Sequence, residues 1–378
     1  MQTSEDEDVG RCDRLDREFE GKRLKMRWKR FLETTVLILA GLAPTATVAE
    51  AWKVDVWTPP FTHDRPSQTV TYQPLDRAAK PWKLCISYPH LKDAYWLSVN
   101  YGMVAEAHRL GVAFRLLEAG GYPKLKHQRV QIKDCLAQGA DALIVGTVSY
   151  GGLSDLMEEV ARDMPVIASV NDISNEGIAA KVGVSWVEMG RVTGAYLAKR
   201  HPKGTPGARV ALFPGPTKPE WVGFVLDGFR DGIAGSAIEV VVTKRGDTGK
   251  EIQRTLIEEA LEEVPDIDYI VGTSVTAEAA VSQLAMVSPK TTTQIVSFYM
   301  THGVYRGIKR GKILAAPTDR PALQGRMSIE QAVRVLDGRV LYSHLGPAIT
   351  MVDGGNIENL DIHQSLAPAS FIPVFEAP

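Results

Sequence analysis

Cysteine and histidine are scarce in this chain, with 3 cysteines and 8 histidines among 378 residues. None of them stands in the short paired spacing of a metal-ligand set, so we predict neither a metal site nor a cofactor. The sequence also lacks a G-x-S-x-G nucleophile elbow, an H-E-x-x-H motif and a paired set of acids. We therefore predict a protein that performs no chemistry on its ligand.

An excess of charge of one sign is missing as well. The formal net charge is -2, and the sequence has neither a basic stripe nor a long block of like charge. Nucleic-acid binding depends on clustered Lys and Arg, so we expect no nucleic-acid partner. After residue 52 no apolar run approaches the ~20 residues of a membrane-spanning helix, so we expect no direct membrane insertion of the mature chain.

The segment Met26–Trp52 has the three parts of a secretory signal peptide. A basic patch at 27–30 precedes an apolar run at 36–43, and small residues at 47–49 or 49–51 offer a cleavage triplet. A short amphipathic helix is the alternative. We expect the polar stretch before Met26 to come from a start codon assigned too early. The signal peptide predicts a mature protein that works outside the cytoplasm.

From Lys83 onward, short β-rich apolar runs alternate regularly with amphipathic helical stretches. The first unit is the run 83–88 and a helix at about 94–110, whose apolar residues recur near the 3.6-residue period. Strands that alternate with helices of this length indicate a doubly wound parallel sheet of the α/β class. The alternation slips after the strand 180–184 and begins again at residue 209, so we predict two lobes of similar fold.

A further helix at about 323–336 follows the second series, which indicates that the chain returns to the first lobe. This pattern resembles the type I periplasmic binding protein architecture, in which hinge crossovers join two lobes and the ligand lies between the carboxyl ends of both sheets. We expect crossovers near 184–186, 317–319 and 342–347. The predicted division is a leader with signal peptide (1–51), an extended arm (52–81), an N-terminal lobe (82–184 plus about 318–342) and a C-terminal lobe (185–317 plus about 343–378).

Two cysteines remain after the leader, Cys85 and Cys135. A pair in an oxidising compartment can form a disulfide. In the strand order 2-1-3 of such a lobe, the second helix crosses over the first strand, which brings Cys135 on that helix close to Cys85 on that strand. We predict a disulfide between them, with two buried free thiols as the alternative.

Aromatic side chains gather at the predicted carboxyl ends of the strands, although aromatics make up only 7% of the chain. Ring faces attract a methylated, positively polarised nitrogen by about 0.5–2 kcal/mol per ring, and Tyr hydroxyl and Trp N–H groups can donate to an oxygen of the same ligand. Core packing is the alternative role for any single ring. Asp93 either orients a ring or caps the helix that follows it. The predicted ligand-binding residues are Tyr95, Trp96, Tyr122, Trp186 and Tyr299.

Several strings between residues 80 and 378 are more specific than the general fold requires. They include Trp82-Lys83-Leu84-Cys85, Leu91-Lys92-Asp93, Tyr95-Trp96-Leu97-Ser98, Leu117-Glu118-Ala119-Gly120-Gly121-Tyr122, Val182-Gly183-Val184 with Trp186, Val296-Ser297-Phe298-Tyr299 and Val304-Tyr305-Arg306-Gly307. These strings resemble the TorT family of periplasmic trimethylamine N-oxide (TMAO) sensor proteins. The arm and the tail are the least family-like parts.

The resemblance implies that the chain binds TMAO in the periplasm and presents the bound state to a membrane sensor histidine kinase of the TorS type, which controls TMAO respiration. It also implies that the five predicted rings form the ligand cage. The N–O group would accept hydrogen bonds from Tyr and Trp donors, and the methyl groups would face the rings. A transporter-associated solute-binding protein for a sugar or a methylated amine is the alternative function.

Overall fold

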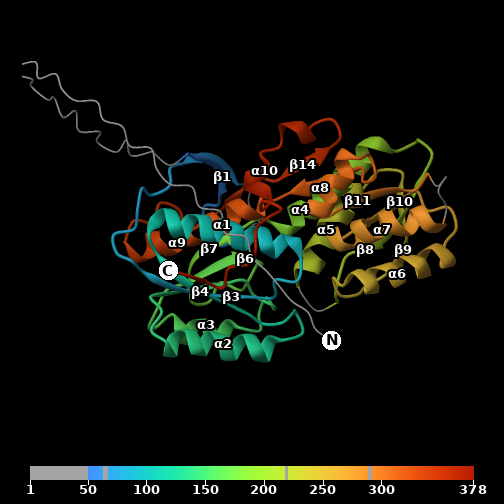
Figure 1. Ribbon diagram of the computed structural model, residues 1–378. Helices are drawn as coiled ribbons and strands as arrows, with labels where there is room; N and C mark the ends of the chain where they lie inside the picture. Colours follow the sequence, from blue (N-terminus) through green and yellow to red (C-terminus); the bar gives the residue numbers. More distant parts are fainter. Residues whose placement is uncertain (1–49, 63–66, 218–219, 288–291) are drawn as a thin grey trace, which may run out of the picture. The chain divides into compact units, whose positions relative to one another are not determined.

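Figure 1 shows the computed structural model of the protein, which describes residues 50–62, 67–217, 220–287 and 292–378. The predicted leader and its signal peptide lie outside these ranges, apart from Glu50 and Ala51. No helix within the ranges combines the length and the apolar character that a membrane span needs. The chain from residue 50 onward is organised around two sheets.

The first sheet has nine strands in the order β15-β4-β3-β5-β6-β7-β13-β1-β2. Strands β3 to β7 and β13 run parallel, whereas β15 pairs antiparallel with β4 at one edge and β1 and β2 form antiparallel pairs at the other. The strands are β1 (Trp52–Val56), β2 (Gln68–Tyr72), β3 (Lys83–Tyr88), β4 (Ala113–Glu118), β5 (Ala142–Val145), β6 (Val166–Val170), β7 (Ile178–Gly183), β13 (His344–Pro347) and β15 (Glu376–Ala377).

Helices cover both faces of the first sheet because its central strands are apolar on both sides. On β3, Leu84 and Ile86 pack into one hydrophobic cluster with α1 and α9, whereas Cys85 packs into another cluster with α2 and α3. Figure 1 shows these two helix layers. The first sheet and these helices are called the first lobe below. The helices are α1 (Ala94–Leu110), α2 (Leu125–Ala137), α3 (Ser154–Val160) and α9 (Pro321–Leu336).

The second sheet has six strands in the order β14-β12-β11-β10-β8-β9, parallel except for β14. The strands are β8 (Ala208–Phe213), β9 (Ile238–Thr243), β10 (Tyr269–Gly272), β11 (Gln294–Ser297), β12 (Ala315–Thr318) and β14 (Thr350–Asp353). The helices that pack on this sheet are α4 (Trp186–Arg200), α5 (Glu220–Ile233), α6 (Lys250–Glu263), α7 (Ser274–Val287) and α8 (His302–Lys309). This sheet and its helices are called the second lobe.

The predicted fold class, two doubly wound parallel sheets of the type I periplasmic binding protein fold, is confirmed. Four connections join the sheets, one between β7 and α4, one between β12 and α9, one between β13 and β14, and one between β14 and β15. The first two lie where the sequence predicts crossovers. The third lies at residues 348–349, just after the predicted range of 342–347. We propose that the lobe boundaries follow these four connections.

Three segments differ from the predicted division of the chain. Residues 52–81 contain β1 and β2, which extend the edge of the first sheet instead of forming a separate arm. The reason is a short alternation in β1, where Trp52, Val54 and Val56 are buried, and Trp52 stacks on Tyr72 of β2 with ring centroids 5.8 Å apart. Five prolines lie in this segment outside the two strands, and they favoured an extended arm over strands in the sequence. Residues 344–347 and 376–377, which the sequence places in the C-terminal lobe, belong to the first sheet as β13 and β15.

The chain after β14 returns to the first lobe. It passes through a short 3-10 turn (Ile357–Asn359) and α10 (Ile362–Ser365) and ends in β15. On the way, the carbonyl oxygen of Ala367 lies 2.6 Å from Nε2 of His302 in the second lobe. The backbone N–H of Ala367 donates to Oγ of Ser98 in the first lobe at 3.2 Å. The C-terminal segment therefore contacts both lobes close to the start of α1.

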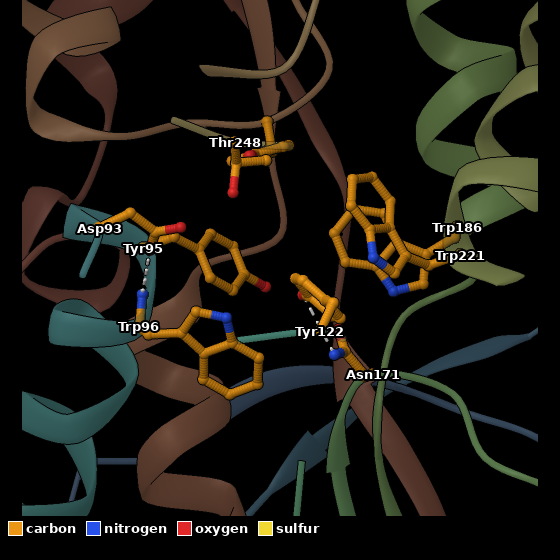
Figure 2. A pocket seen from close by; sticks show the side chains of 9 residues that line it. Asp93, Tyr95, Trp96, Tyr122, Asn171, Trp186, Trp221 and Thr248 are labelled. Atoms are coloured by element: carbon orange, nitrogen blue, oxygen red, sulfur yellow. Dashed lines mark hydrogen bonds between the residues drawn. The ribbon is translucent and has the colours of Figure 1, made fainter. Parts of the chain in front are cut away.

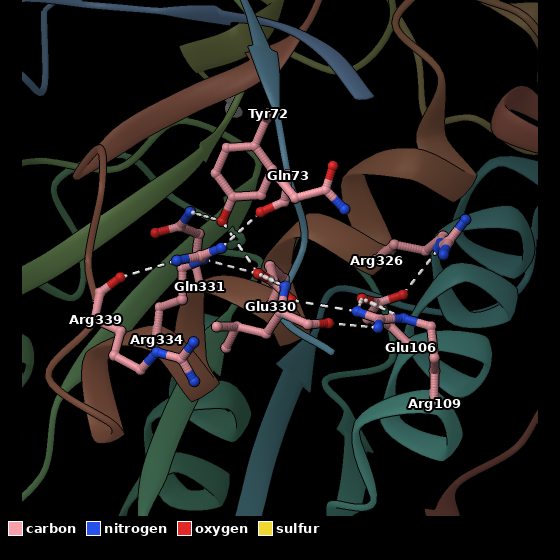
Figure 3. A network of polar contacts seen from close by, with 10 residues as sticks. Tyr72, Gln73, Glu106, Arg109, Arg326, Glu330, Gln331, Arg334 and Arg339 are labelled. Atoms are coloured by element: carbon pink, nitrogen blue, oxygen red, sulfur yellow. Dashed lines mark hydrogen bonds and ion pairs between the residues drawn. The ribbon is translucent and has the colours of Figure 1, made fainter. Parts of the chain in front are cut away.

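A buried network of charges holds α1, α9 and β2 together (Figure 3). Glu330 of α9 has no exposed surface, and its carboxylate accepts hydrogen bonds from the Leu75 N–H at 2.8 Å and from Arg334 Nε at 2.7 Å. Glu106 of α1 is equally buried and pairs with Arg109 and Arg326. These two carboxylates are compensated by arginines, which is what burial of charge requires.

A disulfide joins Cys85 on β3 to Cys135 on α2, with their Cα atoms 5.7 Å apart. Both residues are buried, and their neighbours are the apolar residues between the sheet and α2 and α3. The bond therefore fixes α2 against the first strand of the parallel sheet.

Candidate functional site

A small cavity lies between the carboxyl ends of the strands of the two lobes (Figure 2). Its volume, including the open mouth, is about 330 Å³. In open α/β sheets this edge is where ligands bind, because loops from several strands meet there. The lining residues are Asp93, Tyr95, Trp96, Tyr122, Asn171, Trp186, Trp221, Thr248 and Tyr299.

The structure brings all five predicted cage residues into the lining of this one cavity. Tyr95 and Trp96 lie in the first turn of α1, Tyr122 follows β4, Trp186 begins α4, and Tyr299 follows β11. The rings of all but Tyr122 meet edge to face in a continuous series, which is a favourable geometry for aromatic pairs. The ring centroids are 5.9 Å apart for Tyr95–Trp96, 5.5 Å for Tyr95–Tyr299 and 6.3 Å for Trp186–Tyr299.

Asp93 fixes the start of α1 and thereby the two rings that follow it. Its backbone is extended, and its carboxylate accepts a hydrogen bond from the N–H of Trp96 at 3.1 Å, which is the geometry of a helix N-cap. The same side chain lines the cavity. Asp93 therefore both caps the helix and presents a carboxylate to the site.

A close approach of α4 and α5 places Trp186 beside Trp221. Gly190 and Gly228 make this approach possible, because a Cβ atom added at Gly228 would lie 1.8 Å from the carbonyl oxygen of Val187. The centroids of the two indole rings are consequently 5.3 Å apart. Figure 2 shows the two indoles together on one side of the cavity, with Asp93, Tyr95 and Trp96 on the other.

Three polar atoms in the cavity wall have no hydrogen-bond partner among the described residues. They are Nε1 of Trp186, Nε1 of Trp221 and Oγ1 of Thr248, and all three side chains are buried. A buried donor without a partner costs stability, so it is uncommon unless a ligand or water completes it. The two indole N–H groups can each donate to an acceptor atom in the cavity.

The charged side chain that lines the cavity is the carboxylate of Asp93. Burial raises the pKa of Asp93 from 3.8 to about 6, and the hydrogen bond from Trp96 opposes this only in part. Nearby, burial lowers the pKa of His90 to about 4, so its ring is neutral at pH 7. Lys92 forms its ion pair with Asp247 rather than with Asp93. The cavity thus holds a carboxylate that lacks a cationic partner of its own within the described part of the chain.

Hydroxyl groups of two tyrosines are held by residues outside the aromatic cage. The Tyr95 hydroxyl donates to Oδ2 of Asp319 at 2.5 Å, and the Tyr122 hydroxyl accepts from Nδ2 of Asn171 at 3.3 Å. Burial raises the pKa of both hydroxyls above the usual range, so both tyrosines are neutral. These bonds fix the orientation of the two rings.

Sequence reasoning missed Trp221, Asn171 and Thr248, which also line the cavity. Each follows the carboxyl end of a parallel strand, β8, β6 and β9 respectively. The rule that located the other rings therefore applies to them too, but a loop separates Trp221 from its strand, and the other two are not aromatic. Within the described ranges, no group of three or more His, Cys, Asp or Glu side chains is arranged to hold a metal ion.

Comparison with known proteins relates most of the chain to binding proteins. The family model for periplasmic binding proteins and the sugar binding domain of the LacI family matches residues 81–372. Periplasmic protein TorT of Escherichia coli (strain K12) is 41% identical over 313 residues, which cover 83% of this chain and 90% of that protein.

Two solved structures extend the comparison. An ABC transporter solute binding protein from Bradyrhizobium sp. BTAi1 with bound bis-tris aligns with a TM-score of 0.78 and 49% identity, covering 86% of this chain and 98% of that one. A chain of the TorS sensor domain–TorT complex in the presence of TMAO aligns with a TM-score of 0.73 and 41% identity, covering 78% of this chain and 99% of that one.

Proposed function

The chain belongs to the family of periplasmic binding proteins and sugar binding domains of the LacI type, and we propose that it is a periplasmic TMAO sensor. It binds TMAO in the aromatic cavity without changing it chemically. It then presents the bound state to a membrane sensor histidine kinase of the TorS type, which controls TMAO respiration. The relatives TorT and the TorS–TorT complex support this assignment.

One observation carries the choice of ligand. The unpartnered N–H groups of Trp186 and Trp221 lie on one side of the cavity, and the carboxylate of Asp93 lies on the other. TMAO is a small dipole with a negative oxygen and a positive, fully methylated nitrogen. Its oxygen accepts from the two indoles, and its nitrogen end lies toward Asp93 and the ring faces, where cation–π attraction favours it.

The remaining walls of the cavity suit the methyl groups of the ligand. These groups cannot donate hydrogen bonds, so apart from the charge of Asp93 they are best surrounded by ring carbon. Tyr95, Tyr122 and Tyr299 supply ring surface at these positions; the Tyr95 hydroxyl donates to Asp319, and the Tyr122 hydroxyl accepts from Asn171. A cavity of this composition suits a few heavy atoms with one acceptor.

Signalling requires that the ligand change the balance between conformations that the kinase distinguishes. The lining residues come from both lobes, so TMAO contacts both lobes only when they are close together. Binding therefore favours the closed arrangement by the differential contacts that it makes there. We propose that the kinase reads this arrangement.

A second candidate is a solute-binding protein that delivers a methylated amine to a transporter. The 49% identity to an ABC transporter solute binding protein favours it. A sugar is a poorer candidate ligand, because its hydroxyl groups need many polar partners whereas most of this cavity's wall is aromatic. The two candidates share the cavity and differ in the protein that receives the bound form.

Calorimetric titration of the mature protein with TMAO, betaine, choline and ribose tests the ligand, in a buffer free of bis-tris. We expect TMAO to bind most tightly and ribose not to bind. Trp186→Ala should weaken TMAO binding by more than about 1 kcal/mol with the fold intact by circular dichroism. Unchanged affinity of this variant would remove Trp186 from the site.

The receiving protein is tested with the isolated periplasmic domain of a TorS-type kinase. Association of this domain with the mature protein, measured by analytical ultracentrifugation with and without TMAO, would support the sensor function. If the kinase domain instead fails to associate in both conditions while the mature protein binds TMAO or a methylated amine tightly, that outcome would replace the sensor function with the transporter function.

A further inference from the structure

Asp319 is a buried carboxylate that does not line the cavity but contacts a residue that does. It follows β12 directly and lies in the connection that leads from the second lobe to α9 in the first. Its side chain has no exposed surface, and burial raises its pKa. No lysine or arginine of the described chain forms an ion pair with it.

The contacts of Asp319 centre on Tyr95. Its Oδ2 atom accepts from the Tyr95 hydroxyl at 2.5 Å and from Nε2 of Gln324 at 2.7 Å. Gln324 also donates to the backbone carbonyl oxygen of Asp319 at 2.9 Å. The Gln324 side chain therefore cannot move away without breaking both of its hydrogen bonds to Asp319. The Tyr95 hydroxyl is thus occupied, and the ring is the part of Tyr95 that remains for a ligand.

A purely structural role explains this arrangement poorly. A buried carboxylate without a cation costs stability, and an apolar side chain of similar size usually costs less. Oδ1 of Asp319 has no hydrogen-bond partner among the described residues, which adds to that cost. Groups kept at such a cost are concentrated at functional sites.

Building on the proposed function, we propose that Asp319 is a positioning residue for ligand selectivity. It holds the Tyr95 hydroxyl away from the ligand and fixes the ring edge to face against Tyr299 and Trp96. The methyl groups of the ligand then meet ring carbon, and the indoles of Trp186 and Trp221 are left to bind its oxygen. Because Asp319 belongs to a connection between the lobes, the correct position of Tyr95 depends on the closed arrangement.

A double-mutant cycle tests this proposal. TMAO affinity is measured by calorimetry for the wild type, Asp319→Leu, Tyr95→Phe and the double variant. We expect Asp319→Leu to weaken binding about tenfold, and to weaken it less than about twofold further in the Tyr95→Phe background, because both changes remove one interaction. Equal losses in the two backgrounds, or no loss in either, would overturn the proposal.

Asp319→Asn is the conservative control, because its amide oxygen can still accept from Tyr95. The Asn oxygen can take the place of Oδ2, which accepts from Tyr95 and Gln324, and its N–H₂ group the place of Oδ1, which has no partner among the described residues. We expect affinity within about threefold of the wild type. A loss as large as that of Asp319→Leu would show that the charge, and not the position of Tyr95, is what matters.

Two further outcomes stay distinguishable. If Asp319→Leu does not fold, Tyr95→Phe alone tests the proposal. We expect Tyr95→Phe to weaken TMAO binding about fivefold. Wild-type affinity of this variant would overturn the proposal. If the wild type binds choline or betaine instead of TMAO, the proposed ligand is wrong, and the same cycle is measured with the ligand that binds.

Discussion

The Nζ atom of Lys92 lies 3.1 Å from Oδ2 of Asp247, and this ion pair joins the loop after β3 in the first lobe to the loop after β9 in the second. Each partner directly precedes a residue that lines the cavity, Asp93 in one case and Thr248 in the other. The pair therefore connects the lobes beside the proposed ligand. Its side chains are 41% and 34% exposed, so it is screened by salt.

We expect Lys92→Gln to weaken TMAO binding by up to about 1 kcal/mol, because an exposed pair contributes little. Raising the salt concentration should weaken the wild type and leave the variant nearly unchanged. Lys133→Gln is the matched control, since Lys133 pairs with Glu159 at 3.9 Å within the first lobe. Equal salt dependence in wild type and Lys92→Gln, measured by calorimetry, would show that this pair does not support closure.

The two indole N–H groups can be tested without removing their rings. Trp186→Phe and Trp221→Phe each keep an aromatic surface and delete one donor. We expect each to weaken TMAO binding by about 1.5–3 kcal/mol, the usual value of a hydrogen bond to a charged acceptor. Binding of tetramethylammonium, which has the methyl groups but no oxygen, should change much less.

Trp82 provides a matched control, because it does not line the cavity. Its Nε1 donates to Asp337 at a distance of 2.8 Å. Trp82→Phe should leave TMAO affinity unchanged. If Trp186→Phe weakens TMAO and tetramethylammonium equally, its indole acts as a packing surface and not as a donor to the N-oxide oxygen.

The fold could be predicted from the sequence because its central strands are short apolar runs separated by amphipathic helices. The gathering of the five rings around one cavity could be predicted because the carboxyl ends of parallel strands meet at one edge. The contact of Tyr95 with Asp319 could not, since 224 positions separate the two residues and neither has a local signal for the other. The unpartnered state of the indoles is also invisible in sequence, because it depends on how α4 and α5 pack.

The edge of the first sheet shows a different limit. Residues 52–56 and 68–72 alternate over only five positions each, and prolines lie between and beyond them. Such short segments become strands only because β13 offers an edge and α9 offers the buried partners Glu330 and Gln331 to Tyr72. Tertiary contacts, not local pattern, decide the structure of this segment.

The buried charges of Figure 3 predict a large stability effect. Glu330→Leu leaves the guanidinium of Arg334 without its 2.7 Å partner and removes the acceptor of the Leu75 N–H. We expect the free energy of unfolding to fall by about 3–5 kcal/mol, the usual cost of breaking a buried pair. Urea denaturation measures it, with Glu251→Leu as the exposed control on α6, which should change stability by less than about 0.5 kcal/mol. A similar small change at Glu330 would contradict the network's role.

The raised pKa of Asp93 predicts how stability depends on pH. Because the folded protein holds this proton up to about pH 6 and the unfolded chain only up to about 3.8, ionisation costs stability. The cost is absent below pH 4, grows between pH 4 and 6, and is on the order of 3 kcal/mol at pH 7. Asp93→Asn should remove it while keeping the helix cap, since Asn caps as well as Asp. Urea unfolding at pH 5 and pH 7 measures the difference, which should be smaller in the variant.

The same carboxylate makes ligand binding depend on pH in the opposite direction. A positive nitrogen beside Asp93 favours its ionised form, so TMAO affinity should rise roughly fivefold from pH 5 to pH 7 and level off above. His90, with its pKa lowered to about 4, stays neutral across this range and does not contribute. Asp93→Asn should bind more weakly at pH 7 and show a flat profile. An affinity that falls as pH rises would mean that protonated Asp93 donates to the N-oxide oxygen, with the ligand turned end for end in the cavity.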